Sequence, residues 1–343
     1  WPGATAGQLR WRTRCGQQAE REETTWRHYP TRGPARHSRR RHRPRSDVFG
    51  TNTAAKTFAL TITMFRQGGS MSVPTITLND GVPIPQLGFG TWKVPANEAE
   101  KAVSAALEAG FRHIDTAAIY GNEEGVGRAL ADSGLDRKDL FVTTKLWNDS
   151  HHADDARKAI ETSLAKLGLD HVDLYLIHWP APVKYGDAYI EAWNALQDFK
   201  SEGLTRSIGV SNFKTEHLDA IEGAAPSVDQ IEMHPSFNQA TFRAELAERG
   251  INPEAWSPLG QSKDLDNPVL TDISKATGKT PAQVVIRWHL QIGNIVFPKS
   301  VTPSRIVENF DVFDFELSDE QIAAIDGLDH GNRLGGDPST ADF

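Results

Sequence analysis

Short apolar runs alternate with longer amphipathic runs along residues 71–343. The apolar runs are five to eight residues long and rich in Val, Ile and Leu, which is typical of strands covered on both faces. The amphipathic runs place Ala, Leu and Ile at helical spacing, and several close on glycine, as NEAEKAVSAALEAG does. The pattern predicts eight strands, at 86–91, 112–116, 140–146, 172–178, 205–212, 227–232, 251–257 and 294–300.

Strands that alternate with helices predict βα units and a parallel sheet. Eight such units close into an α/β fold, the (β/α)8 TIM barrel, which takes about 250 residues. The run SVPTITLNDG predicts an N-terminal β-hairpin, and GNRLGGDPSTADF predicts a short C-terminal tail. A doubly wound sheet is the alternative, but GFGTWK lacks the third glycine of the dinucleotide-binding fingerprint.

Charge divides the chain near Met71. The first 70 residues hold 14 Lys and Arg against 4 Asp and Glu, whereas the remainder holds 23 against 41. Of those 14 basic residues, 13 are Arg, and ARHSRRRHRPRS has no hydrophobic period that would build a core. We therefore expect residues 1–70 to be a disordered, Arg-rich extension, translated from sequence upstream of Met71, and residues 71–343 to be the barrel domain.

Two other interpretations of the extension are open. An Arg-rich arm could bind nucleic acid through phosphate groups. Alternatively, TFALTITMF behind the arginines could be the apolar part of an export signal, although this run is short and no small-residue cleavage site follows it. We expect a cytoplasmic monomer that binds no nucleic acid. We also expect no membrane association, because the chain has no apolar run long enough to span a bilayer.

Four reactive side chains fall at the predicted ends of neighbouring strands. Asp115 ends the second strand and Tyr120 follows in the next loop, while Lys145 ends the third strand and His178 the fourth. Each alone has an ordinary explanation, such as a helix cap, a surface lysine or a hydrogen-bonded core histidine. Active sites of (β/α)8 barrels lie at the carboxyl ends of the strands, so the convergence of the four predicts a catalytic cluster.

The chain resembles the aldo-keto reductases, and among them the bacterial 2,5-diketo-D-gluconate reductases. The resemblance rests on GFGTWKV, FRHIDTAAIYGNEEGVGRAL, LFVTTKLW, VDLYLIHWP, IGVSNF, DQIEMHP, AWSPLG and FPKSVTPSRIVENF, which cover 73–330 in the family's order. It implies NADPH-dependent reduction of a carbonyl, of the aldehyde, keto-sugar or diketo-gluconate type, to an alcohol. It also implies a catalytic tetrad formed by Asp115, Tyr120, Lys145 and His178.

The chemistry of the four side chains fits that reaction. Hydride reduction of a carbonyl leaves an alkoxide that needs a proton, and Tyr120 can supply it. The phenol has a usual pKa of about 10, which is high for acid catalysis at neutral pH. A buried ammonium, Lys145, is expected to lower that pKa, and Asp115 is expected to keep the ammonium charged. His178 is expected to orient the carbonyl.

A second group of residues is expected to bind the cofactor, NADPH. The resemblance assigns Ser211, Asn212 and Gln230 to the nicotinamide carboxamide, Trp256 to stacking on the nicotinamide, and Glu308 and Asn309 to the adenine. Thr302 is a good N-cap and Pro303 suits the first helical position, so a helix begins beside Lys299 and Arg305. A helix N-terminus beside cations favours an anion, here the 2′-phosphate. The predicted set is completed by Ser257, Leu259, Ser300 and Val301.

Three tryptophans, Trp92, Trp147 and Trp179, follow predicted strands and are expected to wall the substrate pocket together with His178. No metal site is expected. His151, His152, Asp154 and Asp155 share one loop before a helix, where capping and solvation explain them better. The competing functional class is a non-catalytic nicotinamide-binding sensor or regulatory subunit on the same fold.

A protein that starts at Met71 is predicted to fold and turn over like the full chain, because residues 1–70 contribute nothing to the predicted core. Thermal melts and steady-state assays of the two proteins check this. A large drop in melting temperature or in activity on truncation would show that the extension belongs to the folded enzyme.

Overall fold

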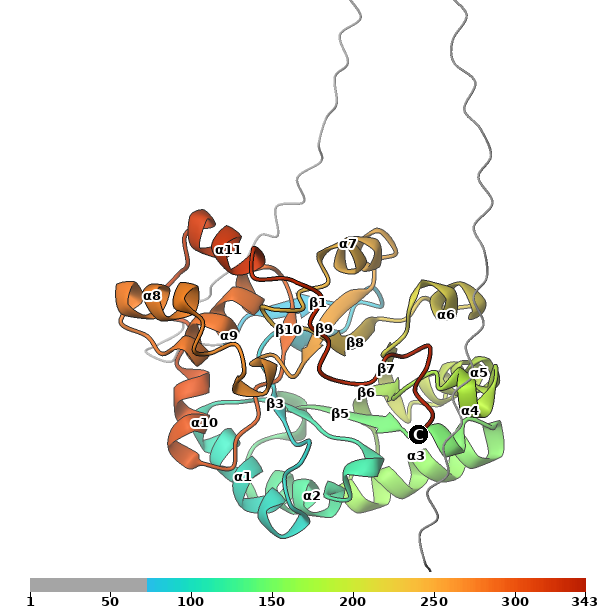
Figure 1. The fold of residues 1–343 in the computed structure, drawn as a ribbon. Coiled ribbons are helices and arrows are strands. Elements are labelled where there is room, and N and C mark those ends of the chain that lie inside the picture. Colours follow the sequence, from blue (N-terminus) through green and yellow to red (C-terminus); the bar gives the residue numbers. More distant parts are fainter. Residues whose placement is uncertain (1–72) are drawn as a thin grey trace, which may run out of the picture. The chain divides into compact units, whose positions relative to one another are not determined.

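The computed structural model describes residues 73–343 (Figure 1). The expectations for residues 1–70 therefore lie outside the described residues. Within 73–343, no helix combines the length and the apolar character needed to cross a membrane.

Eight parallel strands form the predicted barrel. They are hydrogen-bonded in the order β10-β9-β8-β7-β6-β5-β4-β3, and a parallel bridge between Leu87 and Val296 joins the two edges. Each strand lies within one of the eight predicted ranges, so both the fold class and the strand count are confirmed. The strands are β3 (Phe89–Gly90), β4 (His113–Asp115), β5 (Phe141–Leu146), β6 (Val172–Ile177), β7 (Thr205–Ser211), β8 (Val228–Glu232), β9 (Asn252–Trp256) and β10 (Ile295–Val296).

Helices surround the strands and cover them with one apolar face (Figure 1). Gly110 and Gly168 end α1 and α3 in the left-handed conformation, with φ of 114° and 66°, as predicted. Trp193 and Trp288 are fully buried. The helices are α1 (Ala96–Ala109), α2 (Glu123–Asp132), α3 (Ala153–Leu167), α4 (Pro182–Tyr185), α5 (Ala188–Ser201), α6 (Thr215–Ala220), α7 (Ala240–Glu248), α8 (Pro268–Thr277), α9 (Pro281–Gln291), α10 (Pro303–Phe310) and α11 (Asp319–Asp326), with short 3-10 helices η1 (Ala118–Tyr120), η2 (Arg137–Asp139), η3 (Asn148–Ser150) and η4 (Gly260–Ser262).

The predicted N-terminal hairpin closes the amino end of the barrel. Its strands β1 (Thr75–Thr77) and β2 (Pro83–Pro85) pair antiparallel. Apolar side chains of the hairpin pack against the inward side chains of the barrel strands, in a cluster made of Ile76, Leu78, Ile84, Phe141, Leu174, Leu176, Val228, Ile295 and Phe297. The hairpin therefore fills the amino end of the barrel. The reactive side chains lie at the opposite, carboxyl end, where the strands that carry them terminate.

Candidate active site

The structure brings the four predicted catalytic residues to the carboxyl end of the barrel. Asp115 is the last residue of β4 and Lys145 lies near the end of β5. His178 directly follows β6, and Tyr120 ends η1, one short loop after β4. Asn122 holds that loop, since its Nδ2 donates to the carbonyls of Thr91 and Val94 at 3.0 Å each. Sequence analysis had not assigned this residue.

A buried ion pair forms the floor of the cluster. Lys145 Nζ donates to both carboxylate oxygens of Asp115, at 2.7 and 2.8 Å, and to the carbonyl of Thr116 at 2.8 Å. The lysine side chain is fully buried and that of Asp115 is 6% exposed. Burial opposes the charge on Lys145, but Asp115 outweighs it and holds the lysine pKa above its usual value.

Tyr120 lies beside this pair, and Lys145 Nζ is 5.2 Å from the centre of its ring. Burial raises the pKa of Tyr120 to about 12, while the charge of Lys145 acts to lower it. Lys145 thus acts in the expected direction, but the phenol's net pKa lies above its usual value rather than below it. The physical reason is that loss of hydration around the phenolate outweighs the attraction of an ammonium whose charge Asp115 largely offsets.

His178 faces Tyr120 across the cluster, with ring centres 5.6 Å apart and planes at 74°. Burial and the nearby charge of Lys145 hold the histidine pKa far below its usual value. The imidazole is therefore neutral at physiological pH. A neutral ring can donate one N–H hydrogen bond to a substrate oxygen, but it is a poor source of a proton.

The residues assigned to the nicotinamide are hydrogen-bonded to one another and to the cluster. Trp256 Nε1 donates to Asn212 Oδ1 at 2.9 Å, and Asn212 Nδ2 donates to the carbonyl of His178 at 3.0 Å. Ser211 Oγ donates to the carbonyl of Gln230 at 2.7 Å. Gln230 Nε2 in turn donates to Asp115 Oδ2 at 2.9 Å. Of the two amides that are expected to hold the cofactor, that of Gln230 thus contacts the buried ion pair directly.

The residues assigned to the phosphates and adenine follow β9 and β10. Ser257 and Leu259 come after Trp256, and Lys299, Ser300 and Val301 lead into α10, which carries Arg305, Glu308 and Asn309. Lys299 and Arg305 are exposed. Thr302 is the N-cap of α10 and Pro303 its first residue, as predicted, but the threonine side chain makes no capping hydrogen bond. The backbone N–H of Thr302 donates instead to Ser300 Oγ at 3.0 Å.

The comparisons with known proteins agree with this geometry. A family model described as the aldo/keto reductase family matches residues 86–330. Methylglyoxal reductase DkgA of Yersinia pestis is 53% identical over 270 residues, which are 77% of this chain and 96% of that protein. The crystal structure of an aldo/keto reductase from Brucella melitensis has a TM-score of 0.74 and 52% identity, and the match covers 76% of this chain and 100% of that one. Gox0644, solved as a mutant in complex with NADPH, has a TM-score of 0.75 and 45% identity over 78% of this chain and 98% of its own.

The chain belongs to the aldo-keto reductase family. Aldo-keto reductases are NADP-dependent oxidoreductases, so the predicted enzyme class and cofactor are confirmed. The roles of the individual residues are not tested by these comparisons and stay predictions.

Aromatic side chains wall the mouth of this aldo-keto reductase. Trp179 is buried, Trp147 is half-buried and lies edge-on to His178 at 5.2 Å, and Trp92 is 43% exposed. Phe343, in the tail, stacks on Trp147 with ring centres 6.1 Å apart and meets Trp179 edge-on at 4.9 Å. The sequence analysis missed Phe343, because a lone aromatic in a polar tail carries no periodic signal.

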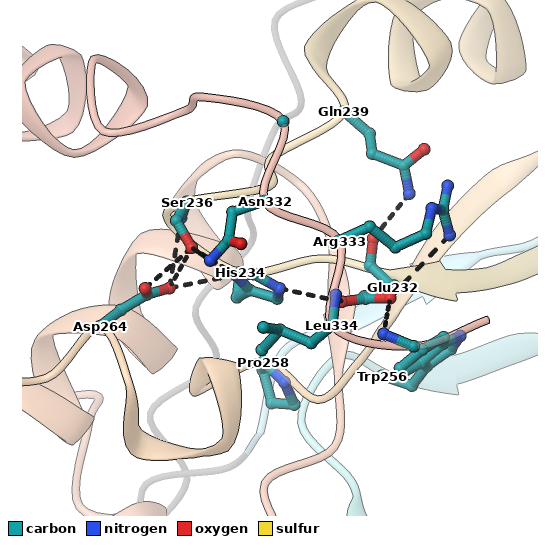
Figure 2. A network of polar contacts seen from close by, with 12 residues as sticks. Glu232, His234, Ser236, Gln239, Trp256, Pro258, Asp264, Asn332, Arg333 and Leu334 are labelled. Atoms are coloured by element: carbon teal, nitrogen blue, oxygen red, sulfur yellow. Dashed lines mark hydrogen bonds and ion pairs between the residues drawn. The ribbon is translucent and has the colours of Figure 1, made fainter. Parts of the chain in front are cut away.

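The tail reaches these tryptophans by crossing the carboxyl ends of β9 to β6, drawn in dark red in Figure 1. Figure 2 shows its anchor, in which Glu232 accepts hydrogen bonds from the backbone N–H groups of Leu334 and Gly335 at 2.6 and 2.9 Å. Gly335 lies so close that an added Cβ would be 2.4 Å from Trp256 Cη2. The tail therefore packs directly beside the indole that is assigned to nicotinamide stacking.

A buried histidine lies between two carboxylates of the same anchor (Figure 2). His234 Nε2 is 3.1 Å from Glu232 Oε1, and its Nδ1 is 3.0 Å from Asp264 Oδ2. Burial opposes the charge on His234, but the two carboxylates outweigh it and raise the histidine pKa above its usual value. When protonated, His234 is a counter-ion of the carboxylate that holds the tail, in addition to Arg333, whose Nη1 is 3.9 Å from Glu232 Oε2.

Glu232→Gln is predicted to lower the free energy of unfolding by about 1–3 kcal/mol, because a charged acceptor of two backbone N–H groups and an imidazolium is lost. The loss should be largest below the usual histidine pKa and shrink as pH rises through the raised value, since His234 then loses its charge. Urea unfolding at several pH values checks this. Glu100→Gln, which breaks only an exposed pair with Arg128, should have a much smaller effect. Equal losses in the two variants would contradict the prediction.

Proposed function

We propose that this aldo-keto reductase uses NADPH to reduce a small aldehyde or ketone to an alcohol, with Tyr120 as the proton donor. The observation that carries the proposal is the Asp115–Lys145 ion pair beneath Tyr120 and opposite His178, at the open end of the barrel. NADPH supplies the hydride when bound. The protein's own groups must then hold the carbonyl and deliver one proton to the developing alkoxide.

The residues present fit a nicotinamide cofactor. The amides of Asn212 and Gln230 complement a carboxamide, and the indole of Trp256 offers a planar surface whose orientation is held by its hydrogen bond to Asn212. The N-terminus of α10, with Lys299 and Arg305 beside it, suits a phosphate. This donor set supports NADPH without requiring a Rossmann fold.

The two sides of the cluster have different tasks in the proposed reaction. His178, neutral and buried, donates a hydrogen bond to the substrate oxygen and thereby orients the carbonyl. Tyr120 gives its proton to the same oxygen as negative charge develops there. Lys145 stabilises the phenolate that remains, and Asp115 keeps Lys145 charged and in place. The high pKa of the resting phenol keeps the proton on Tyr120 until the alkoxide forms.

The walls of the site favour a small substrate. Phe343 contacts both Trp147 and Trp179 at the mouth, so that three large rings share the entrance. Relatives from Yersinia pestis and Escherichia coli carry the name methylglyoxal reductase. We therefore propose small oxo-aldehydes of the methylglyoxal type and keto-sugar or diketo-gluconate compounds as the substrate class.

Tyr120→Phe is predicted to lower carbonyl reduction by at least about 10²-fold, because the ring stays but the proton donor is lost. Affinity for NADPH should be unchanged. The test is NADPH oxidation, followed by absorbance, with methylglyoxal, keto-sugars and simple aldehydes. Lys145→Met should also lose most activity, whereas Tyr185→Phe serves as a control that removes a phenol outside the cluster. Near-normal activity of Tyr120→Phe would refute the assignment of the acid, and silence of the wild type with every carbonyl would favour the sensor.

Arg305→Ala is predicted to weaken NADPH binding by about 10- to 150-fold and to leave NADH nearly unchanged. Charge-assisted hydrogen bonds to the 2′-phosphate contribute about 1.5–3 kcal/mol, and NADH has no such phosphate. Fluorescence titration of both cofactors, with Trp256 as reporter, measures the two affinities. Lys166→Ala, in the last turn of α3, is the control for loss of an exposed cation elsewhere. If the affinities for NADPH and NADH fall equally, Arg305 contacts a group that the two cofactors share, and the assignment to the 2′-phosphate is wrong.

A further inference from the structure

Glu254 is a buried carboxyl that the proposed reaction does not use. Only the side chain of Gln230 lies between it and the ion pair of Asp115 and Lys145. Glu254 on β9 is the register partner of Gln230 on β8. Gln230 Nε2 donates to Glu254 Oε2 at 3.0 Å and to Asp115 Oδ2 at 2.9 Å. The two hydrogens of one amide nitrogen therefore join Glu254 to the carboxylate that holds Lys145.

The surroundings of Glu254 leave it without a cation of its own. Its side chain is fully buried, and within residues 73–343 Oε1 has no hydrogen-bond partner. The hydrogens of Lys145 are directed at Asp115 and at the carbonyl of Thr116. On the other side, β10 presents apolar Ile295 in register with Glu254.

The charged and titratable groups that act on Glu254 are Asp115 on β4, Lys145 on β5 and Asp229 on β8. Burial and the charge of Asp115, more than any other cause, raise the pKa of Glu254 to about 8. Asp229 is itself fully buried, and burial raises its pKa well above the usual value. While Glu254 is protonated, it adds no second negative charge beside the pair of Asp115 and Lys145.

We propose that Glu254 is a positioning residue for carbonyl reduction. As a neutral acid, it holds the Gln230 amide against Asp115 and preserves the one-to-one charge balance beneath Tyr120. Its ionisation would add a second negative charge that acts on Lys145, offset the positive charge that assists Tyr120 and slow proton delivery. Reduction should therefore decline as pH rises through the ionisation of Glu254. This inference rests on the proposed function of Tyr120.

The decisive variant is Glu254→Gln, which keeps an acceptor for Gln230 and cannot ionise. At pH 6.5 its kcat for methylglyoxal with saturating NADPH should lie within about threefold of the wild type. At pH 9, about one unit above the pKa of Glu254, only about a tenth of the wild-type molecules keep Glu254 protonated. The ratio of variant to wild-type kcat should therefore be about tenfold higher than at pH 6.5. Glu254→Leu removes the acceptor and should lower kcat by about tenfold or more at every pH, with a smaller change in KM. If Glu254→Leu fails to fold, the pH profile of Glu254→Gln decides alone.

A second readout needs no turnover. The pKa of Glu254 is higher in the folded than in the unfolded protein. Between the ordinary glutamate pKa and about pH 8, the folded protein therefore keeps a proton that the unfolded chain has lost. Because of this, the stability of the wild type falls as pH rises towards about 8. The melting temperature of Glu254→Gln minus that of the wild type should therefore increase between pH 5 and pH 8. Glu123→Gln, a buried exchange whose contact is with Thr144 and not with Gln230, is the control for the kcat profile, which should run parallel to that of the wild type.

The outcomes separate the two claims. Parallel kcat profiles of the wild type and Glu254→Gln, or a melting-temperature difference that is constant with pH, would overturn the role of Glu254. Retention of activity by Tyr120→Phe would overturn the proposed function, and the melting temperatures would still report whether Glu254 is protonated in the folded protein. The proposal is supported if the kcat of Glu254→Gln declines at a higher pH than that of the wild type and the difference between their melting temperatures depends on pH.

Discussion

The buried ion pair between Lys145 and Asp115 is the interaction on which the rest of the site depends. An ammonium inside a barrel is tolerated only if its charge and its hydrogens are satisfied, and here a carboxylate and a backbone carbonyl satisfy them. Removing one partner of such a pair costs about 3–5 kcal/mol, because the other charge stays buried. Tyr120, His178 and Gln230 are arranged around this pair, and its charge influences the pKa of both Tyr120 and His178.

The barrel directs all of this chemistry to one end. The hairpin fills the amino end with Ile76, Leu78 and Ile84, and the bridge between Leu87 and Val296 closes the ring of strands. Parallel strands then bring the ends of β4, β5 and β6 side by side, although their residues are far apart in sequence. This is why a carboxylate, an ammonium and an imidazole form a cluster without any local motif.

Strand β8 connects the catalytic cluster to the tail. Gln230 and Glu232 are two residues apart, and side chains at this spacing lie on the same face of a strand. Gln230 reaches Asp115 and Glu254, whereas Glu232 binds His234 and the backbone of Leu334 and Gly335. Along β9 the same spacing separates Glu254 from Trp256. Two buried polar networks, one around Asp115 and Lys145 and one that holds the tail, therefore share the same face of strand β8.

The sequence by itself determined the barrel and the convergence of the strand ends that carry Asp115, Lys145 and His178. Eight apolar runs separated by amphipathic helices admit few other folds, and once the strands are parallel their ends must converge, which places Asp115, Lys145 and His178 together. Only the tertiary structure decided the remainder. The burial that raises the pKa of Tyr120 depends on everything packed around it, and the Gln230 bridge to Glu254 depends on the register of β8 with β9. Glu232 binds the tail at Leu334, and Phe343 in the tail contacts Trp147 and Trp179. Each of these contacts joins residues about a hundred or more positions apart. Hydrophobic periodicity reports which face a residue occupies, but not which polar group meets it across the barrel.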